Sequence, residues 1–331
     1  MTDIVTDIAA LQKTWRKNLE DLPATPEKIP VFFFGHGTPI LEFPASNDGG
    51  VMQWAGSAGP LAKFLKDFGP ALLKKYQPKG IVVFSAHWET TAERLVTDYD
   101  DENPLLFDYY GFQPELYELK FKSKGDSTLS SRVVELYKES RGSDGRGFSG
   151  MSPRTSGNQA LVDLPPNIGQ TSAQSSPGPG FDHGVFVPFR IMFGEELTDV
   201  PIVQVSIDSS LSPETHWALG KAVAKLREEG ILVLSGGLVA HNLDDRGSFA
   251  PQTANPLHKE FDRATVAAVS VVDGAERKKA MVNLTKHSGF RACHPREDHF
   301  VPLYVAAGAG EGGYSKVIAD IYGGETVAFG L

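Results

Sequence analysis

The sequence predicts a single-domain α/β fold in which a central, mostly parallel or mixed sheet is flanked by helices. Short hydrophobic runs typical of strands alternate with helical patterns along the chain, which is characteristic of this fold class. No linker separates two domains, and 331 residues are enough for one large α/β domain. Three of the hydrophobic runs end on a histidine. Because ligands bind at the carboxyl edge of parallel strands, these histidines predict a metal site there.

The predicted elements alternate regularly along the chain. Strands are expected at residues 31–35, 80–86, 94–97, 201–207, 231–235 and 326–330. Helices are expected at residues 58–76, 127–141, 213–229, 256–272 and 298–309. We expect the main domain to span residues 30–331, with a helical extension before it at residues 1–29.

Residues 142–180 interrupt this alternation. Gly, Ser, Pro, Asn and Gln crowd the segment, and no apolar period survives in it. We therefore expect a long loop insertion, which is either a lid or a passive insertion. It leads directly into Phe181-Asp182-His183-Gly184.

The composition is that of a soluble globular protein, with 41% hydrophobic and 22% charged residues. The net charge of -9 argues against nucleic acid as a partner, because nucleic-acid binders usually carry a basic patch. The single cysteine, Cys293, excludes an intrachain disulfide and a multi-cysteine metal site. Histidines and carboxylates are therefore the candidate metal ligands, and the thiol itself is expected to be inert.

Residues 1–28 mix apolar, acidic and basic side chains without a continuous apolar stretch. They are expected to form neither a signal peptide nor a membrane span. We expect a cytoplasmic protein with no membrane partner. A nuclear fraction is compatible with the same features.

His36, His87 and His241 each follow a predicted strand run. Considered singly, each is more often a hydrogen-bonded structural histidine than a metal ligand. Strand ends from separate crossovers reach the same edge of a sheet, however, so three such histidines favour ligation. The glycine pair Gly236 and Gly237 in the run before His241 allows close approach of a backbone or ligand.

His299 is the fourth candidate, at the predicted start of an apolar helix. Glu297 and Asp298 precede it, and N-terminal capping of that helix is the favoured interpretation for both acids. Other catalytic templates are absent from the sequence: there is no G-x-S-x-G elbow, phosphate loop, dinucleotide fingerprint or H-E-x-x-H pair.

His183 would face the same crevice if the apolar run 185–193 packs on the sheet. Its neighbour Asp182 does not form a triad with it, because adjacent side chains on a strand point in opposite directions. The remaining histidines fall in polar contexts and are expected at the surface: His216, His258, His287 and His294.

Six motifs in this order match a known family. They are Gly35-His36-Gly37-Thr38-Pro39, Ser85-Ala86-His87-Trp88, Phe181-Asp182-His183-Gly184, Ser206-Ile207-Asp208-Ser209-Ser210, His241-Asn242-Leu243, and Glu297-Asp298-His299 followed by Pro302-Leu303. The chain resembles the class III extradiol ring-cleavage dioxygenases of the LigB superfamily, in particular the DOPA 4,5-dioxygenase-like branch. The resemblance covers residues 31–310 and departs from the family at the insertion before Phe181.

The resemblance implies an enzyme that opens a catechol ring beside its hydroxyls, using O2 and non-haem Fe(II), with Zn(II) sometimes in the same site. His36 and His87 would be metal ligands. His299 stands where distant relatives place a glutamate ligand, so the set here would be three histidines. His241 would be the acid/base residue or a fourth ligand, and His183 a catalytic histidine near the substrate.

The three-histidine set leaves alternatives open. Three histidines and a water also make a zinc hydrolytic site, so a zinc-dependent hydrolase is one alternative. A non-enzymatic binding module of the same fold is another. Trp88, Phe181 and Phe186 are candidates for an apolar wall that receives the ring. The expected partners are a small catechol and O2, and both a monomer and a homodimer are compatible with the sequence.

Overall fold

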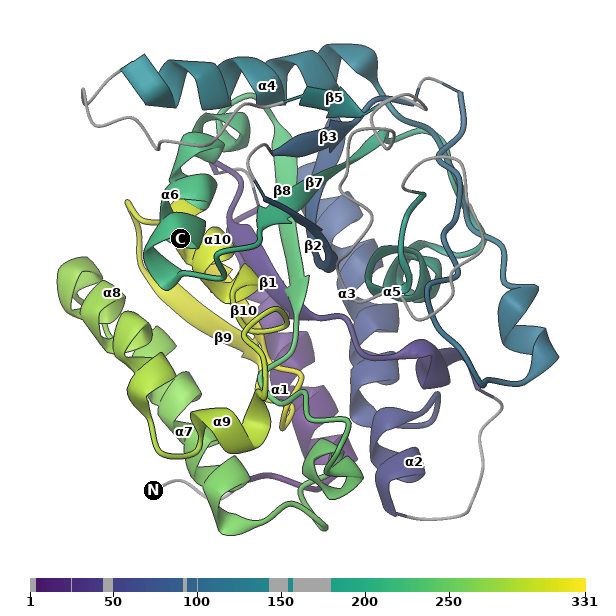
Figure 1. Ribbon diagram of the computed structural model, residues 1–331, viewed down its shortest axis with the longest axis vertical. Coiled ribbons are helices and arrows are strands. Elements are labelled where there is room, and N and C mark those ends of the chain that lie inside the picture. The colour runs from purple at the N-terminus through teal and green to yellow at the C-terminus, as the bar shows by residue number, and fades with distance from the viewer. Residues whose placement is uncertain are drawn as a thin grey trace.

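The computed structural model describes residues 4–24, 26–43, 50–91, 94–99, 101–142, 154–156 and 180–331. Within these residues an eight-stranded sheet lies between two layers of helices (Figure 1). The α/β class with a single domain is thereby confirmed. A separate pair of short strands, β4 (Lys122–Ser123) and β6 (Glu196–Leu197), lies outside the main sheet.

The main sheet has a parallel core with antiparallel margins. Its order is β5-β3-β7-β2-β8-β1-β10-β9. The strands are β1 (Val31–Gly35), β2 (Gly80–Thr90), β3 (Leu95–Thr97), β5 (Arg154–Ser156), β7 (Ile202–Asp208), β8 (Ile231–Gly237), β9 (Ser315–Ala319) and β10 (Thr326–Phe329). Strands β7, β2, β8 and β1 are mutually parallel, whereas β3 and β10 pair antiparallel to them. The carboxyl ends of the four central strands therefore share one edge.

Helices cover both faces of the sheet. They are α1 (Ile8–Glu20), α2 (Gly50–Ala55), α3 (Pro60–Tyr76), α4 (Ser127–Gly142), α5 (His183–Phe193), α6 (Pro213–Ala222), α7 (Pro256–Val269), α8 (Gly274–Val282), α9 (Phe290–Cys293) and α10 (Pro302–Ala309). Short 3-10 helices occur at Pro39–Glu42, Pro114–Tyr117, Ala224–Arg227, Arg246–Phe249 and Asn283–Lys286. Along β1, Phe32 and Phe34 pack with α1, α3 and α5, while Val31 and Phe33 pack with α6 and α10. This alternation follows from the two-residue period of a strand.

The structure corrects several predicted elements. The apolar run 185–193 is helix α5, because the Asp182 side chain caps its N-terminus by accepting the Gly184 N–H. Strand β9 and helix α8 were not predicted. The helix expected at 213–229 ends at Ala222 and continues as a 3-10 helix.

The capping interpretation of the acids beside His299 is wrong. Helix α10 begins at Pro302 and its N-cap is Val301, with no side-chain cap. Asp298 instead accepts the backbone N–H of His299, and Glu297 pairs with Arg291. Asp298 is thus bonded within the turn that carries His299, whereas Glu297 connects that turn to Arg291 on α9.

The surface assignment of the remaining histidines is wrong for three of them. His216, His258 and His294 are buried, and His287 is half-buried. Each buried ring donates to a nearby backbone carbonyl, such as Nε2 of His294 to the Val239 carbonyl at 2.8 Å. A histidine ring whose polar atom is hydrogen-bonded can be buried in the core. The polar residues beside these histidines in the sequence therefore predicted exposure wrongly.

Two parts of the predicted organisation stay predictions. Helix α1 packs on α3, where the Trp15 Nε1–H donates to Asp67 at 2.9 Å, but the division into residues 1–29 and 30–331 is not tested by these contacts. The insertion expected at 142–180 lies outside the described residues, except for its first and last residues and strand β5. Whether the insertion is a lid therefore stays open to experiment.

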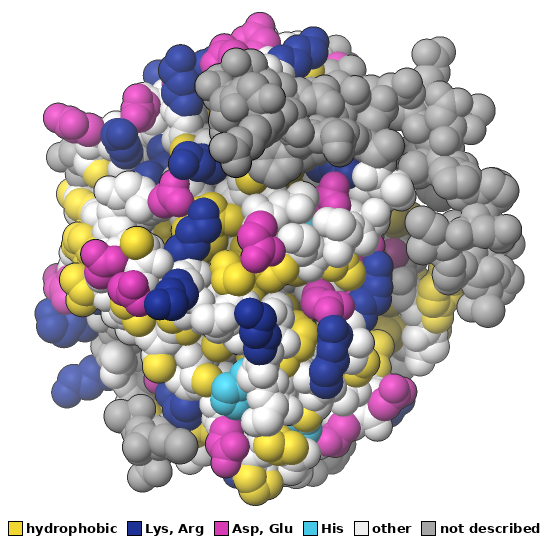
Figure 2. Space-filling view, turned by 60° about the vertical axis from the view of Figure 1, so that its left-hand side comes forward, with side chains coloured by type: hydrophobic (Ala, Val, Ile, Leu, Met, Phe, Trp, Pro, Cys, Tyr) yellow, Lys and Arg dark blue, Asp and Glu magenta, His cyan; other side chains and the backbone are white. Residues whose placement is uncertain are grey.

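Positively and negatively charged side chains are both present on the surface. In the face shown in Figure 2, Lys and Arg are interspersed with Asp and Glu. None of the helices in the described ranges is long and apolar enough to cross a bilayer.

Two buried acids and one half-buried acid form a separate cluster. Asp262, Asp320 and Glu325 place one carboxylate oxygen each within 4.8 Å of the others, and Arg263 pairs with the first two. Glu325 is 1% exposed. Burial and the neighbouring Asp262 raise the pKa of Glu325 well above its ordinary value, although Arg263 opposes the shift.

Glu325→Gln is therefore expected to stabilise the protein at pH 8 more than at pH 5. With a raised pKa, folded Glu325 retains a proton that the unfolded chain releases, so wild-type stability falls as pH rises through this interval. Glutamine does not titrate. The free energy of unfolding of the variant, relative to that of the wild type, therefore grows by up to about 1.4 kcal/mol per pH unit. Urea unfolding at both pH values measures this, with exposed Glu115→Gln as the control. An equal effect of Glu325→Gln at both pH values would contradict the prediction.

Candidate metal centre

Three candidate ligands reach the carboxyl edge of the parallel core from different elements. His36 follows the last residue of β1, and its backbone N–H donates to the Gly237 carbonyl at the end of β8 at 3.1 Å. His87 lies inside β2, where the pairing with β7 is interrupted. His299 lies in the turn before α10. The expected convergence on one sheet edge is observed.

The turn that carries His299 is tied to the sheet at two points. The His299 carbonyl accepts the Leu238 N–H just beyond β8 at 2.9 Å. Arg296 forms a bidentate ion pair with Glu89 on β2, and its Nη2 lies 2.6 Å from Oε2 of Glu89. Neighbouring strands therefore fix the segment relative to His87.

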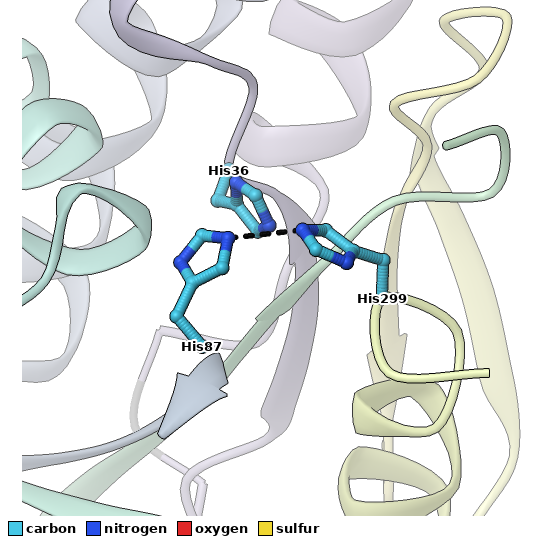
Figure 3. A group of neighbouring side chains, drawn as sticks. All are labelled: His36, His87 and His299. Atoms are coloured by element: carbon cyan, nitrogen blue, oxygen red, sulfur yellow. Dashed lines mark hydrogen bonds between the residues drawn. The ribbon is translucent and has the colours of Figure 1, made fainter. Parts of the chain in front are cut away.

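The three imidazoles point toward one another (Figure 3). One nitrogen from each ring lies within 4.8 Å of the other two. The Nε2 atoms of His87 and His299 are 2.9 Å apart, and the ring centroid of His36 lies 5.0 Å from that of His87 and 5.2 Å from that of His299. A single ion could contact all three rings.

The hydrogen bonds of these rings fit a metal. Nδ1 of His36 lies 2.6 Å from the Gly37 carbonyl, which only accepts, so Nδ1 carries the proton and Nε2 a lone pair. That Nε2 is buried and has no hydrogen-bond partner among the described residues. Burial, and then the neighbouring histidines, lower the pKa of both His36 and His299 well below the ordinary value. Neutral imidazole is the form that binds metal ions.

Asp182 is a residue whose role in the site was missed. Its Oδ1 accepts from the Ser85 hydroxyl at 2.7 Å, the Gly184 N–H at 2.9 Å and Nδ1 of His87 at 3.0 Å, while Oδ2 accepts from Gln204 at 2.7 Å. A Cβ on Gly184 would lie 2.7 Å from Nδ1 of His87, so only glycine fits there. Asp182 thus leaves Nε2 of His87 as the ring's free lone pair.

Burial and hydrogen bonding shift the pKa values of His87 and Asp182 in opposite directions. Burial lowers the pKa of His87, but the hydrogen bond and charge of Asp182 raise it above the ordinary value overall. Burial also raises the pKa of Asp182, and the same bond to His87 holds it below the ordinary value. The carboxylate therefore stays ionised at neutral pH.

The two further candidates lie beside the three-histidine group. The His183 ring stacks on His87 with centroids 4.1 Å apart, and its Nδ1 lies 2.7 Å from Oδ1 of Asp108. The His241 ring stacks on His299 at 3.5 Å. Burial lowers the pKa of His241 to about 4, against the opposing charge of Asp298. The structure thus brings all five candidate histidines together, while their individual roles stay predictions.

The candidate apolar wall belongs largely to the core. Phe181 and Phe186 have no exposed surface, and Trp88 is 8% exposed. Phe186 packs on Phe107 with centroids 5.1 Å apart. The core packing is the simpler account of both phenylalanines.

Known proteins are similar to this chain in sequence. The family model for the catalytic LigB subunit of aromatic ring-opening dioxygenase matches residues 30–143 and 164–329. A 4,5-DOPA dioxygenase extradiol-like protein of Schizosaccharomyces pombe is 38% identical over 318 residues, covering 96% of this chain and 97% of the relative. The 4,5-DOPA dioxygenase extradiol of Beta vulgaris is 29% identical, covering 90% of this chain and 94% of the relative.

A solved structure supports the fold assignment. An uncharacterized protein of Escherichia coli K12 superposes with a TM-score of 0.58 at 22% identity, covering 92% of this chain and 100% of that one. The family match covers most of the chain, including all five candidate histidines. The chain belongs to the LigB family of aromatic ring-opening dioxygenases, on its DOPA dioxygenase-like branch.

Proposed function

We propose that the protein is an extradiol dioxygenase that cleaves a DOPA-like catechol with O2 at a non-haem metal held by His36, His87 and His299. The observation that carries the proposal is the convergence of imidazole nitrogens. Nε2 of His36 is buried and finds no hydrogen-bond partner in the part of the chain that the structure describes, and Nε2 of His87 and Nε2 of His299 are 2.9 Å apart. Two imidazole nitrogens at this distance need a cation or a proton between them. The names of the relatives support a DOPA-like substrate.

Fe(II) is the metal we propose for the active form, and Zn(II) suits the same three nitrogens. A divalent ion held by neutral imidazoles would keep its positive charge and so favour loss of protons from catechol hydroxyls. The ligand rings are held in orientation by the chain itself, through Gly37 for His36 and Asp182 for His87.

His241 is proposed to move the substrate proton. Burial lowers its pKa to about 4, so the ring is neutral at pH 7 and has a lone pair that can accept a proton, although it is a weaker base than an ordinary imidazole. Its stacking on His299 keeps it beside the ligand set. His183, on the far side of His87, is proposed to contact the substrate.

Oxygen uptake tests this function directly. The protein is loaded with Fe(II) under anaerobic conditions and mixed with catechols including DOPA, and an oxygen electrode is combined with visible absorbance. We expect iron-dependent uptake and a new yellow band from the ring-opened semialdehyde. The Zn(II)-loaded protein is the matched control and should consume no O2. Absence of uptake with iron demonstrably bound would overturn the proposal and favour a zinc hydrolase or a binding module.

A further inference from the structure

Asp108 makes two hydrogen bonds to the same residue. Its Oδ1 accepts the backbone N–H of His183 at 3.0 Å and the ring Nδ1–H of His183 at 2.7 Å. A carboxylate oxygen accepts only, so the ring proton is placed on Nδ1. The other ring nitrogen, Nε2, then carries the lone pair.

The loop that carries Asp108 is firmly anchored. Phe107 packs on Phe186, and Tyr109 packs on Tyr117 with centroids 5.2 Å apart. The Tyr109 hydroxyl also donates to the Leu116 carbonyl. Because the residues on both sides of Asp108 are held by packed rings, its carboxylate has little freedom to move away from His183.

His183 lies beside the proposed metal ligands, so a substrate bound at the metal would be within reach of its ring. Its ring is 4.1 Å from that of His87 and 6.2 Å from that of His36, measured between centroids. Its side chain keeps 14% of its surface exposed. Over the described parts of the chain, the hydrogen bonds of this ring go through Nδ1, which leaves Nε2 free for a ligand.

We propose that Asp108 is a positioning residue that locks His183 in the Nδ1–H tautomer, so that Nε2 accepts a hydrogen bond from a hydroxyl of the substrate. The inference rests on the proposed function and deepens it by assigning a hydroxyl-recognition point outside the metal ligands. The tautomer of His183 can be tested without any measurement of turnover.

Two substitutions separate the hydrogen bond from the charge. In Asp108→Asn, the amide oxygen must still face the His183 N–H and Nδ1–H, because the alternative orientation would bring donors together. Asparagine therefore keeps the tautomer without the charge. Asp108→Leu has similar size but no acceptor, so the tautomer is no longer held.

The tautomer is measured by nitrogen NMR of the full chain carrying 15N-labelled histidine, in the metal-free and Zn(II)-loaded states. His183 is assigned by the signals that disappear in His183→Gln. We expect a proton on Nδ1 and none on Nε2 in wild type and Asp108→Asn, and loss of this pattern in Asp108→Leu. An unchanged pattern in Asp108→Leu would overturn the inference.

Kinetics of the Fe(II)-loaded variants supply the second measurement. We expect kcat/KM for the catechol to fall by about 10- to 100-fold in Asp108→Leu, as for other outer-shell substitutions, and to stay within about threefold of wild type in Asp108→Asn. Tyr110→Ala, at an adjacent side chain that is 70% exposed, is the control and should match wild type. Equal losses in the leucine and asparagine variants would contradict the role. If wild type itself consumed no O2, the proposed function would fail while the NMR result still decided the tautomer.

Discussion

His36→Ala is expected to abolish metal binding and turnover together. The buried, unpartnered Nε2 of His36 is one of only three converging ring nitrogens in the proposed set. Two ligands do not retain a divalent ion against water, so we expect less than a tenth of the wild-type metal per chain. Activity should fall by more than about 100-fold, beyond what an outer-shell substitution costs. Metal analysis of the Fe(II)-loaded, desalted protein measures the first effect and oxygen uptake the second.

His241→Ala and His287→Ala complete this experiment. His241 stacks on His299 but is not part of the converging set, so its loss should spare the metal and remove turnover. His287 is half-buried and lies apart from the five candidate residues. His287→Ala should keep the wild-type metal content and the wild-type activity. Wild-type metal content in His36→Ala would exclude His36 as a ligand, and full activity in His241→Ala would exclude a role for His241 in proton transfer.

Asp182→Ala is expected to lower the free energy of unfolding by about 3–5 kcal/mol, the cost of breaking a buried charged pair. The carboxylate is 3% exposed and accepts from four donors, all of which would lose their partner. The ring of His87 would also be released, so metal affinity should fall by about 10- to 100-fold. Urea unfolding and a metal titration measure the two effects.

Asp273→Ala is a matched control because both aspartates cap a helix. Asp273 is exposed and caps α8 by accepting two backbone N–H groups. Loss of a cap alone costs about 1 kcal/mol. If Asp182→Ala cost no more than Asp273→Ala, Asp182 would be a cap and not the support of His87. Asp182→Asn should lie between them, since one carboxylate oxygen becomes an amide that cannot accept.

The parallel core could be predicted because its strands are buried on both faces. Runs such as Ile81-Val82-Val83-Phe84 contain no polar residue, and such runs are typical of parallel strands covered by helices. The positions of His36 and His87 follow from this, because topology alone brings the ends of β1 and β2 to one edge. Strand β9 lies at the margin of the sheet and is less buried, so its sequence gave a weaker signal.

The residues that orient the histidines could not be predicted in the same way. Asp182 follows His87 by 95 residues and Asp108 precedes His183 by 75. No periodic pattern connects such positions. Asp108 lies in an irregular loop, and its partner is set by how aromatic rings pack around it. Asp182 is adjacent to His183 in the sequence, but its contact with His87 depends on helix α5, whose N-terminus Asp182 caps.

The wide spacing of the proposed ligands matters for how the protein is made. His299 lies 212 residues beyond His87, so a nascent chain holds the full set only after residue 299 has been added. Until then an ion has no three-point site to bind. Since a ligand that binds only the native state favours it over the unfolded state, a metal held at the proposed site would stabilise the folded chain. Loss of the metal from the proposed site would then lower the stability of the folded protein as well as its activity.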